Sequence, residues 1–340
     1  FTDLKIYEVA AKAFYKLGVG QYTFRDIPEP EILAPEDVKI KVKYCTICSD
    51  ETKDLGVEDY FSKEQIMGHE MSGVIVELGQ AAKEKGFAIG DHVSGVGVLP
   101  CGHCRMCRSG REHCCLELKQ VTGTLCEYIV WKYTQLIKLP EDIPLQVGCL
   151  AEPLTAVLQA MEKADIQFED HVAIFGAGFC GLMFAQLAKM RGAQNVTIVE
   201  PLKERRALAL QYGADHVIDP NQTDCQILLS DITEFTGFDK IIETSSDFSA
   251  LNLALKSLSR GGTLVAFTYY SYYQKTQINM MQMYLDNITI CSSFLSSNKL
   301  DLSARMLSKL RCEDLITMEL PFLQSEYAYH LEKEKKHIKI

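Results

Sequence analysis

The sequence predicts an α/β protein that combines a doubly wound parallel sheet with a β-rich domain. Residues 171–200 have the pattern of a strand, a glycine-rich turn, a helix and a second strand. Strand-like and helix-like segments then alternate as far as residue 291, as in a parallel sheet joined by helices. The preceding residues are β-rich instead, and a length of 340 residues allows two domains.

The first candidate chemical groups follow a predicted strand in which apolar and lysine residues alternate from Val38 to Tyr44. Cys45 and Cys48 come next in C-x-x-C spacing, which suits a redox pair, half of a zinc site or two structural cysteines. His69 and Glu70 lie side by side in the motif GHE, a pairing that is also common on protein surfaces.

A cysteine-rich segment occupies residues 99–115 and carries enough thiolates for one closed metal site. Cys101, Cys104 and Cys107 repeat every third position and Cys115 follows, with Cys114 as a competing fourth ligand. Four thiolates can enclose Zn²⁺ tetrahedrally without an open position, which makes such a site structural. An iron–sulfur cluster or a redox loop are the alternatives, and structural zinc is favoured.

Glu152 precedes Pro153 at the predicted start of a helix. Proline suits the first helical position, and a carboxylate there is stabilised by the helix dipole. Glu152 is therefore either a helix cap or a neighbour of a metal, and its spacing alone does not separate the two.

Three glycines in G-x-G-x-x-G spacing, at positions 176, 178 and 181, identify a dinucleotide site after the strand at 172–175. The motif's Phe179 and Cys180 open the helix, whose N-terminus faces the phosphates of the ligand. Glu200 ends the second strand, where an acid accepts hydrogen bonds from the ribose hydroxyls and disfavours the 2′-phosphate of NADP. NAD is therefore the expected cofactor.

The basic residues that follow Glu200 argue against a strict preference for NAD. Lys203, Arg205 and Arg206 could meet a 2′-phosphate, so NADP is the less favoured alternative. Further along, four tyrosines between residues 269 and 273 line either a ligand pocket or a buried aromatic loop. Residues 294–340 are too few for another domain and are expected to pack on the first one.

Composition excludes several classes of function. A net charge of −10 opposes general binding to nucleic acid or to an anionic membrane. No apolar run approaches the length of a membrane span, and charged residues occupy the place of a signal peptide. The sequence has 13 cysteines, and their clustering in one window, without a signal peptide, points to metal ligands in a reducing cytoplasm rather than to disulfides.

Together these motifs resemble the zinc-dependent medium-chain dehydrogenase/reductase family, in its sorbitol (polyol) and L-threonine dehydrogenase branch. The resemblance spans nearly the whole chain and rests on ICSDETK at 47–53, GHE, the cysteine-rich segment, AEPL at 151–154 and GAGFCG at 176–181. It implies a GroES-like catalytic domain over residues 1–154, a Rossmann domain over 155–292, and a C-terminal segment, 293–340, that completes the first domain. The family's active site lies between the two domains.

The resemblance also assigns roles to residues. It implies that Cys48, His69 and Glu70 bind a catalytic zinc, with Glu152 as a ligand or exchanging with bound water. The spacing seen in the family favours Cys115 over Cys114 in a second, structural zinc site, and Cys45 falls outside the motif. Bound zinc lowers the pKa of a substrate hydroxyl so that hydride can pass to the nicotinamide.

One part of the motif departs from the family. Relatives carry Ser or Thr two positions after the catalytic cysteine and then Asp, where this chain has Asp50 and Glu51, unless a deletion makes Asp50 the family aspartate. Many relatives also have His at the place of Lys53. Because the Ser or Thr hydroxyl relays the alcohol proton, Asp50 becomes the candidate proton acceptor here.

The expected function is the transfer of hydride between a secondary alcohol, such as a polyol, amino-alcohol or sugar-like compound, and NAD(P). A simple alcohol dehydrogenase and a non-catalytic NAD-binding protein with structural zinc are the alternatives. A redox sensor that uses Cys45 and Cys48 is a weaker one. The resemblance further implies a homodimer or homotetramer, in which the last Rossmann strand, at 287–291, pairs across a two-fold axis.

Overall fold

The computed structural model describes residues 10–18, 20–52, 64–296 and 298–340. The described residues form two compact units: those up to residue 152, together with 300–340, form the first, and those within 153–299 form the second. The second unit thus extends past the expected limit at residue 292. Ser293 N–H donates to the Ala266 carbonyl, and Lys299 forms an ion pair with Glu162, so both residues are tied to the second unit.

The first unit contains a five-stranded antiparallel sheet in the order β10-β6-β5-β3-β9. Its strands are β3 (Asp37–Thr46), β5 (Glu70–Leu78), β6 (His92–Gly95), β9 (Tyr128–Lys132) and β10 (Leu136–Lys138). The apolar positions expected in β3 are buried at Val38 and Ile40, against Trp131. Thr46 pairs with Glu70 in the register of β3 and β5, so the chain after β3 and the chain before β5 meet at one end of the sheet.

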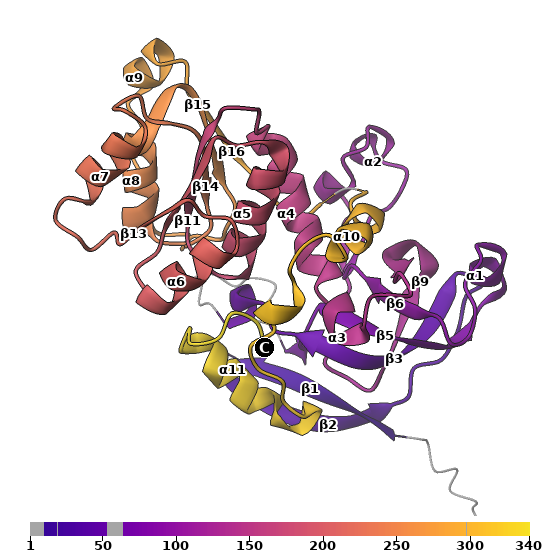
Figure 1. Cartoon of the computed structure of the whole chain (residues 1–340). Helices are drawn as coiled ribbons and strands as arrows, with labels where there is room; N and C mark the ends of the chain where they lie inside the picture. Colours follow the sequence, from indigo (N-terminus) through magenta and orange to yellow (C-terminus); the bar gives the residue numbers. More distant parts are fainter. Residues whose placement is uncertain (1–9, 19, 53–63, 297) are drawn as a thin grey trace, which may run out of the picture. The chain divides into compact units, whose positions relative to one another are not determined.

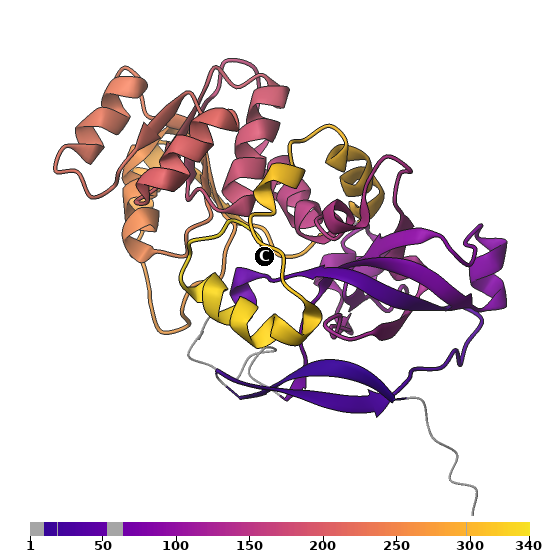
Figure 2. The ribbon, with the colours of Figure 1, turned by 60° about the horizontal axis from the view of Figure 1, so that its bottom comes forward.

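A smaller sheet, β2-β1-β4, lies beside the last helix of the chain, as Figure 2 shows. Its strands are β1 (Ala10–Gly18), β2 (Gln21–Pro28) and β4 (Gln65–Ile66), and the helix is α11 (Ser325–Lys333). The Phe14 ring lies 5.4 Å from Tyr22 and 5.6 Å from Tyr329, centroid to centroid. Burial of these rings attaches the C-terminal segment to the first unit.

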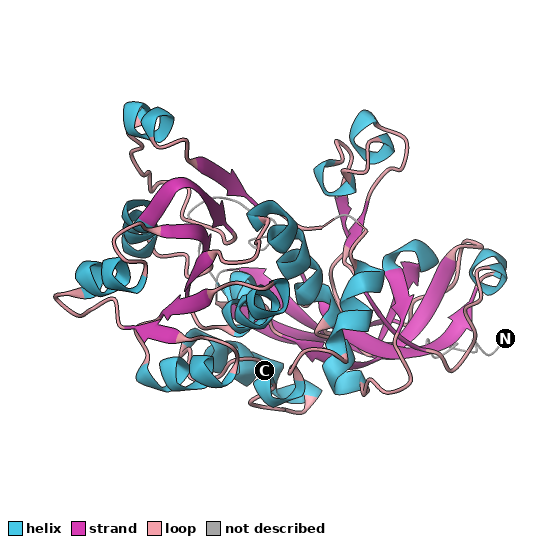
Figure 3. Cartoon of the chain, turned by 45° about the horizontal axis from the view of Figure 1, so that its top comes forward, coloured by secondary structure: helices cyan, strands magenta, loops and turns pink. Residues whose placement is uncertain are grey.

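The second unit is a six-stranded parallel sheet in the order β13-β12-β11-β14-β15-β16 with helices on its faces (Figures 1 and 3). This is the order of a Rossmann fold, so the predicted fold class is confirmed. The strands are β11 (His171–Phe175), β12 (Asn195–Val199), β13 (His216–Ile218), β14 (Phe238–Glu243), β15 (Leu258–Ala266) and β16 (Thr289–Ser292). The helices are α5 (Phe179–Arg191), α6 (Lys203–Gln211), α7 (Cys225–Ile232), α8 (Phe248–Ser257) and α9 (Met280–Leu285).

The remaining elements are short, apart from α4 (Ala151–Ala164), which contains the boundary between the units. They are α1 (Gln80–Glu84), α2 (Arg105–Arg108), α3 (Leu145–Gly148), α10 (Leu300–Leu307), β7 (Val98–Leu99), β8 (Lys119–Gln120), and the 3₁₀ turns η1 (Ser49–Thr52), η3 (Glu112–Cys114), η4 (Tyr133–Gln135), η5 (Glu313–Leu315) and η6 (Phe322–Gln324). None of the helices in the described part of the chain combines the length and apolar character needed to cross a bilayer.

Candidate functional site

Three of the predicted ligands come together at the end of the five-stranded sheet. One potential ligand atom from each of Cys48, His69 and Glu70 lies within 4.8 Å of the other two. Cys48 follows β3, His69 immediately precedes β5 and Glu70 begins it, so the pairing of these strands brings the set together across a gap in sequence. A thiolate, an imidazole and a carboxylate are ligands that zinc accepts, and three protein ligands leave a tetrahedral ion one open position.

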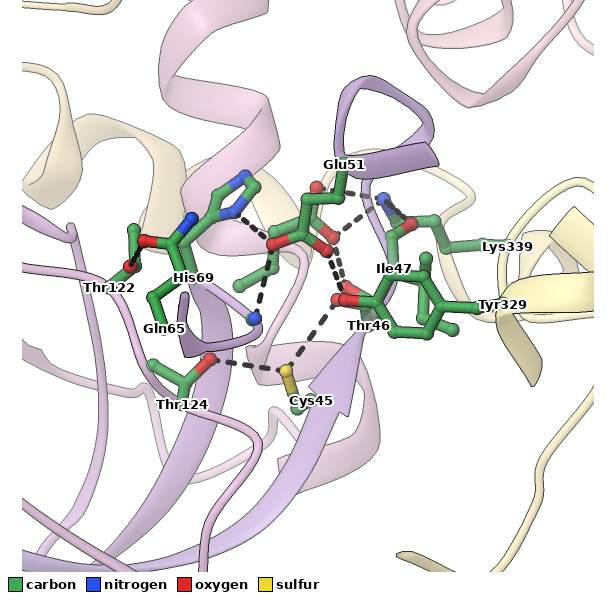
Figure 4. A network of polar contacts seen from close by, with 12 residues as sticks. Cys45, Thr46, Ile47, Glu51, Gln65, His69, Thr122, Thr124, Tyr329 and Lys339 are labelled. Carbon is green, nitrogen blue, oxygen red and sulfur yellow. Dashed lines mark hydrogen bonds and ion pairs between the residues drawn. The ribbon is translucent and has the colours of Figure 1, made fainter. Parts of the chain in front are cut away.

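Glu51 orients the imidazole of His69, a role that the sequence analysis did not assign to it. The Glu51 carboxylate is buried, and Oε1 accepts hydrogen bonds from His69 Nδ1 at 2.8 Å and from the Gly68 amide at 3.1 Å (Figure 4). Because a carboxylate only accepts, Nδ1 carries the proton and Nε2 keeps its lone pair for a metal. Such carboxylate–histidine pairs fix the tautomer and orientation of metal-binding histidines.

The charges around His69 act on its pKa in opposite directions. Burial lowers the pKa of the imidazole, but Glu51 and Cys48 raise it more, so that it ends well above its ordinary value. Burial also raises the pKa of the Glu51 carboxyl, but His69, Tyr329 and Lys339 lower it further than that, so that Glu51 stays ionised. The site therefore favours positive charge at Nε2 of the imidazole, either as a proton or as a bound metal ion.

Two residues from the end of the chain reach into the same cluster. The Tyr329 hydroxyl of α11 donates to Glu51 Oε2 at 2.6 Å. Lys339 is buried, and its Nζ lies 2.8 Å from Glu70 Oε1, 2.6 Å from Oε2 and 3.0 Å from the Ile47 carbonyl. Thr46 Oγ1 also donates to Glu70 Oε2. In Figure 4 the side chains of Tyr329 and Lys339 approach this cluster from the C-terminal segment.

The other predicted members of the site lie near the cluster without joining the three-residue set. Burial raises the pKa of the Cys48 thiol to about 11, and the negative charge of Asp50 adds to this effect. Burial raises the pKa of Glu152 to about 7, and its carboxyl responds to the charges of His69 and Glu70. Lys53 lies outside the described residues.

Cys45 is held in a different way from Cys48, although the two belong to one C-x-x-C motif. Its sulfur lies 3.2 Å from Thr124 Oγ1 and does not belong to the set formed by Cys48, His69 and Glu70. Gly68 has φ +87°, and a Cβ there would come within 2.9 Å of the Cys45 sulfur and 2.7 Å of Thr124 Oγ1. The turn before His69 therefore requires glycine, and Cys45 packs against it.

The cysteine-rich segment forms a second cluster, built around α2 and η3. The sulfurs of Cys101, Cys104, Cys107 and Cys115 all lie within 4.8 Å of one another, and the Sγ–Sγ distances include 3.6 Å and 3.9 Å. A tetrahedral zinc with bonds of about 2.3 Å requires sulfurs about 3.8 Å apart, so this spacing fits the ion. Cys114 is exposed and does not belong to the cluster.

In the second unit, the predicted glycines form the turn between β11 and α5. A Cβ on Gly181 would come within 2.1 Å of the Gly176 carbonyl oxygen, so the helix and the strand approach too closely for any side chain. Gly178 caps α5, and Phe179, which is buried, and Cys180 form its first turn. Helix N-termini that follow such a glycine turn bind phosphate groups in dinucleotide-binding proteins.

Glu200 and Arg205 both lie at this turn. The Glu200 carboxylate accepts hydrogen bonds from the amides of Ala177, at 2.8 Å, and Leu202, at 2.9 Å. It therefore holds the glycine turn and keeps lone pairs for a ligand. A Cβ on Gly178 would lie 3.9 Å from the Arg205 guanidinium, which places that cation beside the turn.

Comparisons with known proteins agree with this geometry. Residues 34–141 match the alcohol dehydrogenase GroES-like domain, and residues 180–310 match the zinc-binding dehydrogenase family. An L-threonine 3-dehydrogenase of an Enterobacter strain is 32% identical over 70% of this chain and 71% of its own length. The probable D-xylulose reductase A of Aspergillus clavatus is 29% identical over 96% of this chain and 95% of its own length. The crystal structure of a zinc-binding dehydrogenase from Clostridium scindens superposes with a TM-score of 0.90, at 27% identity, over 97% of this chain and 98% of that chain.

Proposed function

This chain belongs to the zinc-dependent medium-chain dehydrogenase/reductase family, and we propose that it oxidises a secondary alcohol of a polyol, amino-alcohol or sugar-like substrate with NAD. The observation that carries this proposal is the cluster of Cys48, His69 and Glu70, with Glu51 behind His69. A structural ion needs four protein ligands, whereas a set of three leaves room for a substrate oxygen.

Cys48, His69 and Glu70 would hold the catalytic zinc, and the four clustered cysteines of the first unit would hold a structural one. Bound at the first site, zinc would acidify the alcohol hydroxyl, and NAD would accept the hydride. Glu51 keeps the Nε2 lone pair of His69 directed to the metal, and Glu152 is the candidate fourth group. The expected content is two zinc ions per chain, and loss of one of them in Cys48→Ser would support the assignment.

Asp50 is the candidate acceptor of the alcohol proton in this chain. The proposal is supported by the effect of its charge on the pKa of Cys48, two residues away. An Asp50→Ala variant that keeps full activity across the pH range would remove Asp50 from this role, while Asp50→Asn would separate the loss of charge from the loss of volume.

The charge of the site also bears on the class of substrate. With zinc bound, the Cys48 thiolate and the carboxylates of Asp50, Glu51 and Glu70 would carry four negative charges, against three positive charges on the ion and Lys339. An anionic substrate would be repelled by this excess of negative charge, which favours neutral or cationic alcohols. The compounds in the names of two relatives, threonine and xylulose, carry no net charge at neutral pH.

The decisive experiment follows NADH formation spectrophotometrically over a panel of alcohols. Sorbitol, xylitol, butanediol, threonine, inositols and deoxy-amino-sugars are each tested with NAD and with NADP. Turnover of at least one with wild type, and none with Cys48→Ser, is expected. A single zinc per chain and no turnover of any alcohol would support the alternative of a non-catalytic NAD-binding protein.

NAD is proposed over NADP because Glu200 lies buried at the glycine turn, where a 2′-phosphate would meet its charge. Arg205, beside Gly178, is the residue that opposes this preference. Glu200→Ala is therefore expected to raise the NADP-to-NAD ratio of kcat/KM, and Arg205→Ala is expected to lower it. An unchanged ratio in both variants would contradict the proposal.

A second copy of this chain is the proposed partner of the sheet edge formed by β16. β16 ends the six-stranded sheet, so its outer edge has no strand beside it among the described residues. The neighbouring helix α9 has no buried residue and exposes Met281 and Tyr284. A homodimer would cover both features. Tyr284→Glu is expected to yield monomers in light scattering. Ile227→Glu, at an exposed position of α7, should leave the mass of the assembly unchanged.

A further inference from the structure

The Glu70 carboxylate is engaged by more donors than a simple metal ligand needs. Lys339 Nζ contacts both oxygens, at 2.8 Å and 2.6 Å, and Thr46 Oγ1 donates to Oε2. Glu70 is buried, so water does not compete for these bonds. An ionised carboxylate offers about four lone-pair sites, two on each oxygen. Both sites of Oε2 are therefore taken, and one site of Oε1 remains.

Lys339 is itself held in place by the backbone around it. Its carbonyl accepts from the Thr317 amide at 3.0 Å, and the carbonyl of the next residue, Ile340, accepts from the Ile47 amide at 3.0 Å. The ammonium also contacts the Ile47 carbonyl, one residue before Cys48. The cation is thus fixed to the loop that carries Cys48, and it cannot leave Glu70 without breaking this arrangement.

We propose that Lys339 is a positioning residue that restricts Glu70 to one metal bond, through Oε1. Together with Cys48 and His69, such a bond makes three protein ligands and leaves the fourth tetrahedral position open to exchange. Without the lysine, Oε2 regains a lone pair and Glu70 can bind through both oxygens, as carboxylates do elsewhere. The metal then has four protein donor atoms, and a water or substrate oxygen can bind only as a fifth ligand. This inference rests on the proposed metal centre and concerns its coordination number.

The test uses the full-length protein with Co²⁺ in place of zinc, because cobalt absorption reports coordination geometry. Cys48→Ser, which keeps the four-cysteine cluster, supplies the reference spectrum to subtract. In Lys339→Met we expect the intense bands of four-coordinate cobalt to give way to weaker bands of a five-coordinate ion. We also expect the Cys48-dependent metal to leave more slowly to a chelator, because two oxygens now hold it.

Matched variants separate this effect from a general loss of structure. Lys339→Arg, which keeps the cation and its donors, should restore the wild-type spectrum. Lys336→Met, at an exposed lysine that pairs with Glu334, should not change it. Thr46→Val removes the other donor to Oε2 and leaves the ion pair, so it should also shift the bands toward those of a five-coordinate ion. If Lys339→Met does not fold, Thr46→Val decides the question.

Two results would overturn the proposal, and they differ from failure of the function. An unchanged cobalt spectrum in Lys339→Met and Thr46→Val, or faster metal release in both, would show that the lysine only stabilises the fold. A wild-type protein with no Cys48-dependent cobalt band would instead remove the metal centre and the proposed function with it. Neither readout depends on turnover of an alcohol.

Discussion

Replacement of Glu51 by glutamine tests how the site holds His69. In Glu51→Gln the new amide oxygen can take the place of Oε1 and accept from His69 Nδ1 and the Gly68 amide, as Glu51 does at 2.8 Å and 3.1 Å. The new NH₂ group can donate to the Tyr329 oxygen, because the phenol both donates and accepts. The substitution therefore keeps the number of hydrogen bonds and removes only the negative charge.

The expected magnitude follows from this difference. Loss of an outer partner of a metal-binding histidine costs about 10–100-fold in metal affinity, or about 1.4–2.8 kcal/mol. Glu51→Gln should lie near the lower end, because only the charge assistance is lost. Glu51→Ala should lie near the upper end, because the Gly68 amide and the Tyr329 hydroxyl then lose their acceptor in a buried place.

The assay is competition for zinc with a chromophoric chelator. The zinc that wild type binds and Cys48→Ser does not bind is taken as the catalytic ion. Glu84→Gln, an exposed substitution of the same kind, is the control. Tyr329→Phe should weaken zinc binding in the wild type but add nothing to Glu51→Ala, because the hydroxyl acts through Glu51. Less than threefold change in Glu51→Ala, or full additivity of the two substitutions, would refute this reasoning.

Two further predictions concern the other sites. Cys115→Ser should lose the structural zinc and lower the melting temperature, because a zinc-held loop depends on its fourth thiolate. Cys114→Ser, at an exposed residue outside the cluster, should do neither. Metal analysis and thermal unfolding check both, and equal losses would contradict the assignment. Gly181→Ala should destabilise the second unit by more than about 1 kcal/mol, because its Cβ would lie 2.1 Å from the Gly176 oxygen. Gly178→Ala should fold normally, because its Cβ would have no neighbour closer than 3.9 Å, but it should raise the KM for NAD. A destabilised Gly178→Ala would show instead that the turn itself is strained.

Features of the site that depend on neighbouring residues were accessible from the sequence. The glycine spacing, the strand before it and the acid after it all lie within residues 171–200, and the fold they predict is the one observed. The four cysteines that cluster also lie within one short segment. Such patterns reflect local geometry, so the order of residues along the chain is enough to find them.

The partners of the ligands could not be found in this way. In the sequence Glu51 stands out only as a departure from the family motif, although its place three positions after Cys48 is a usable signal. Tyr329 lies in a helix whose charged end predicts a solvated face, and Lys339 follows a run of exposed lysines and glutamates. A lysine in such a sequence is normally exposed, and only the strand-like pairing of the chain's last residues buries this one.

The C-terminal segment therefore sets the charge of the site as well as its shape. Glu51 and Glu70 are both buried carboxylates, but their partners differ: Glu51 receives a phenol and an imidazole, and Glu70 receives a full cation. An unpaired buried charge is strongly unfavourable, so the contacts of Tyr329 with Glu51 and of Lys339 with Glu70 offset part of the cost of burying the two acids. Because these residues also anchor the segment to the Cys48 loop, the fold of the first unit and the affinity of its metal centre should change together when that anchor is altered.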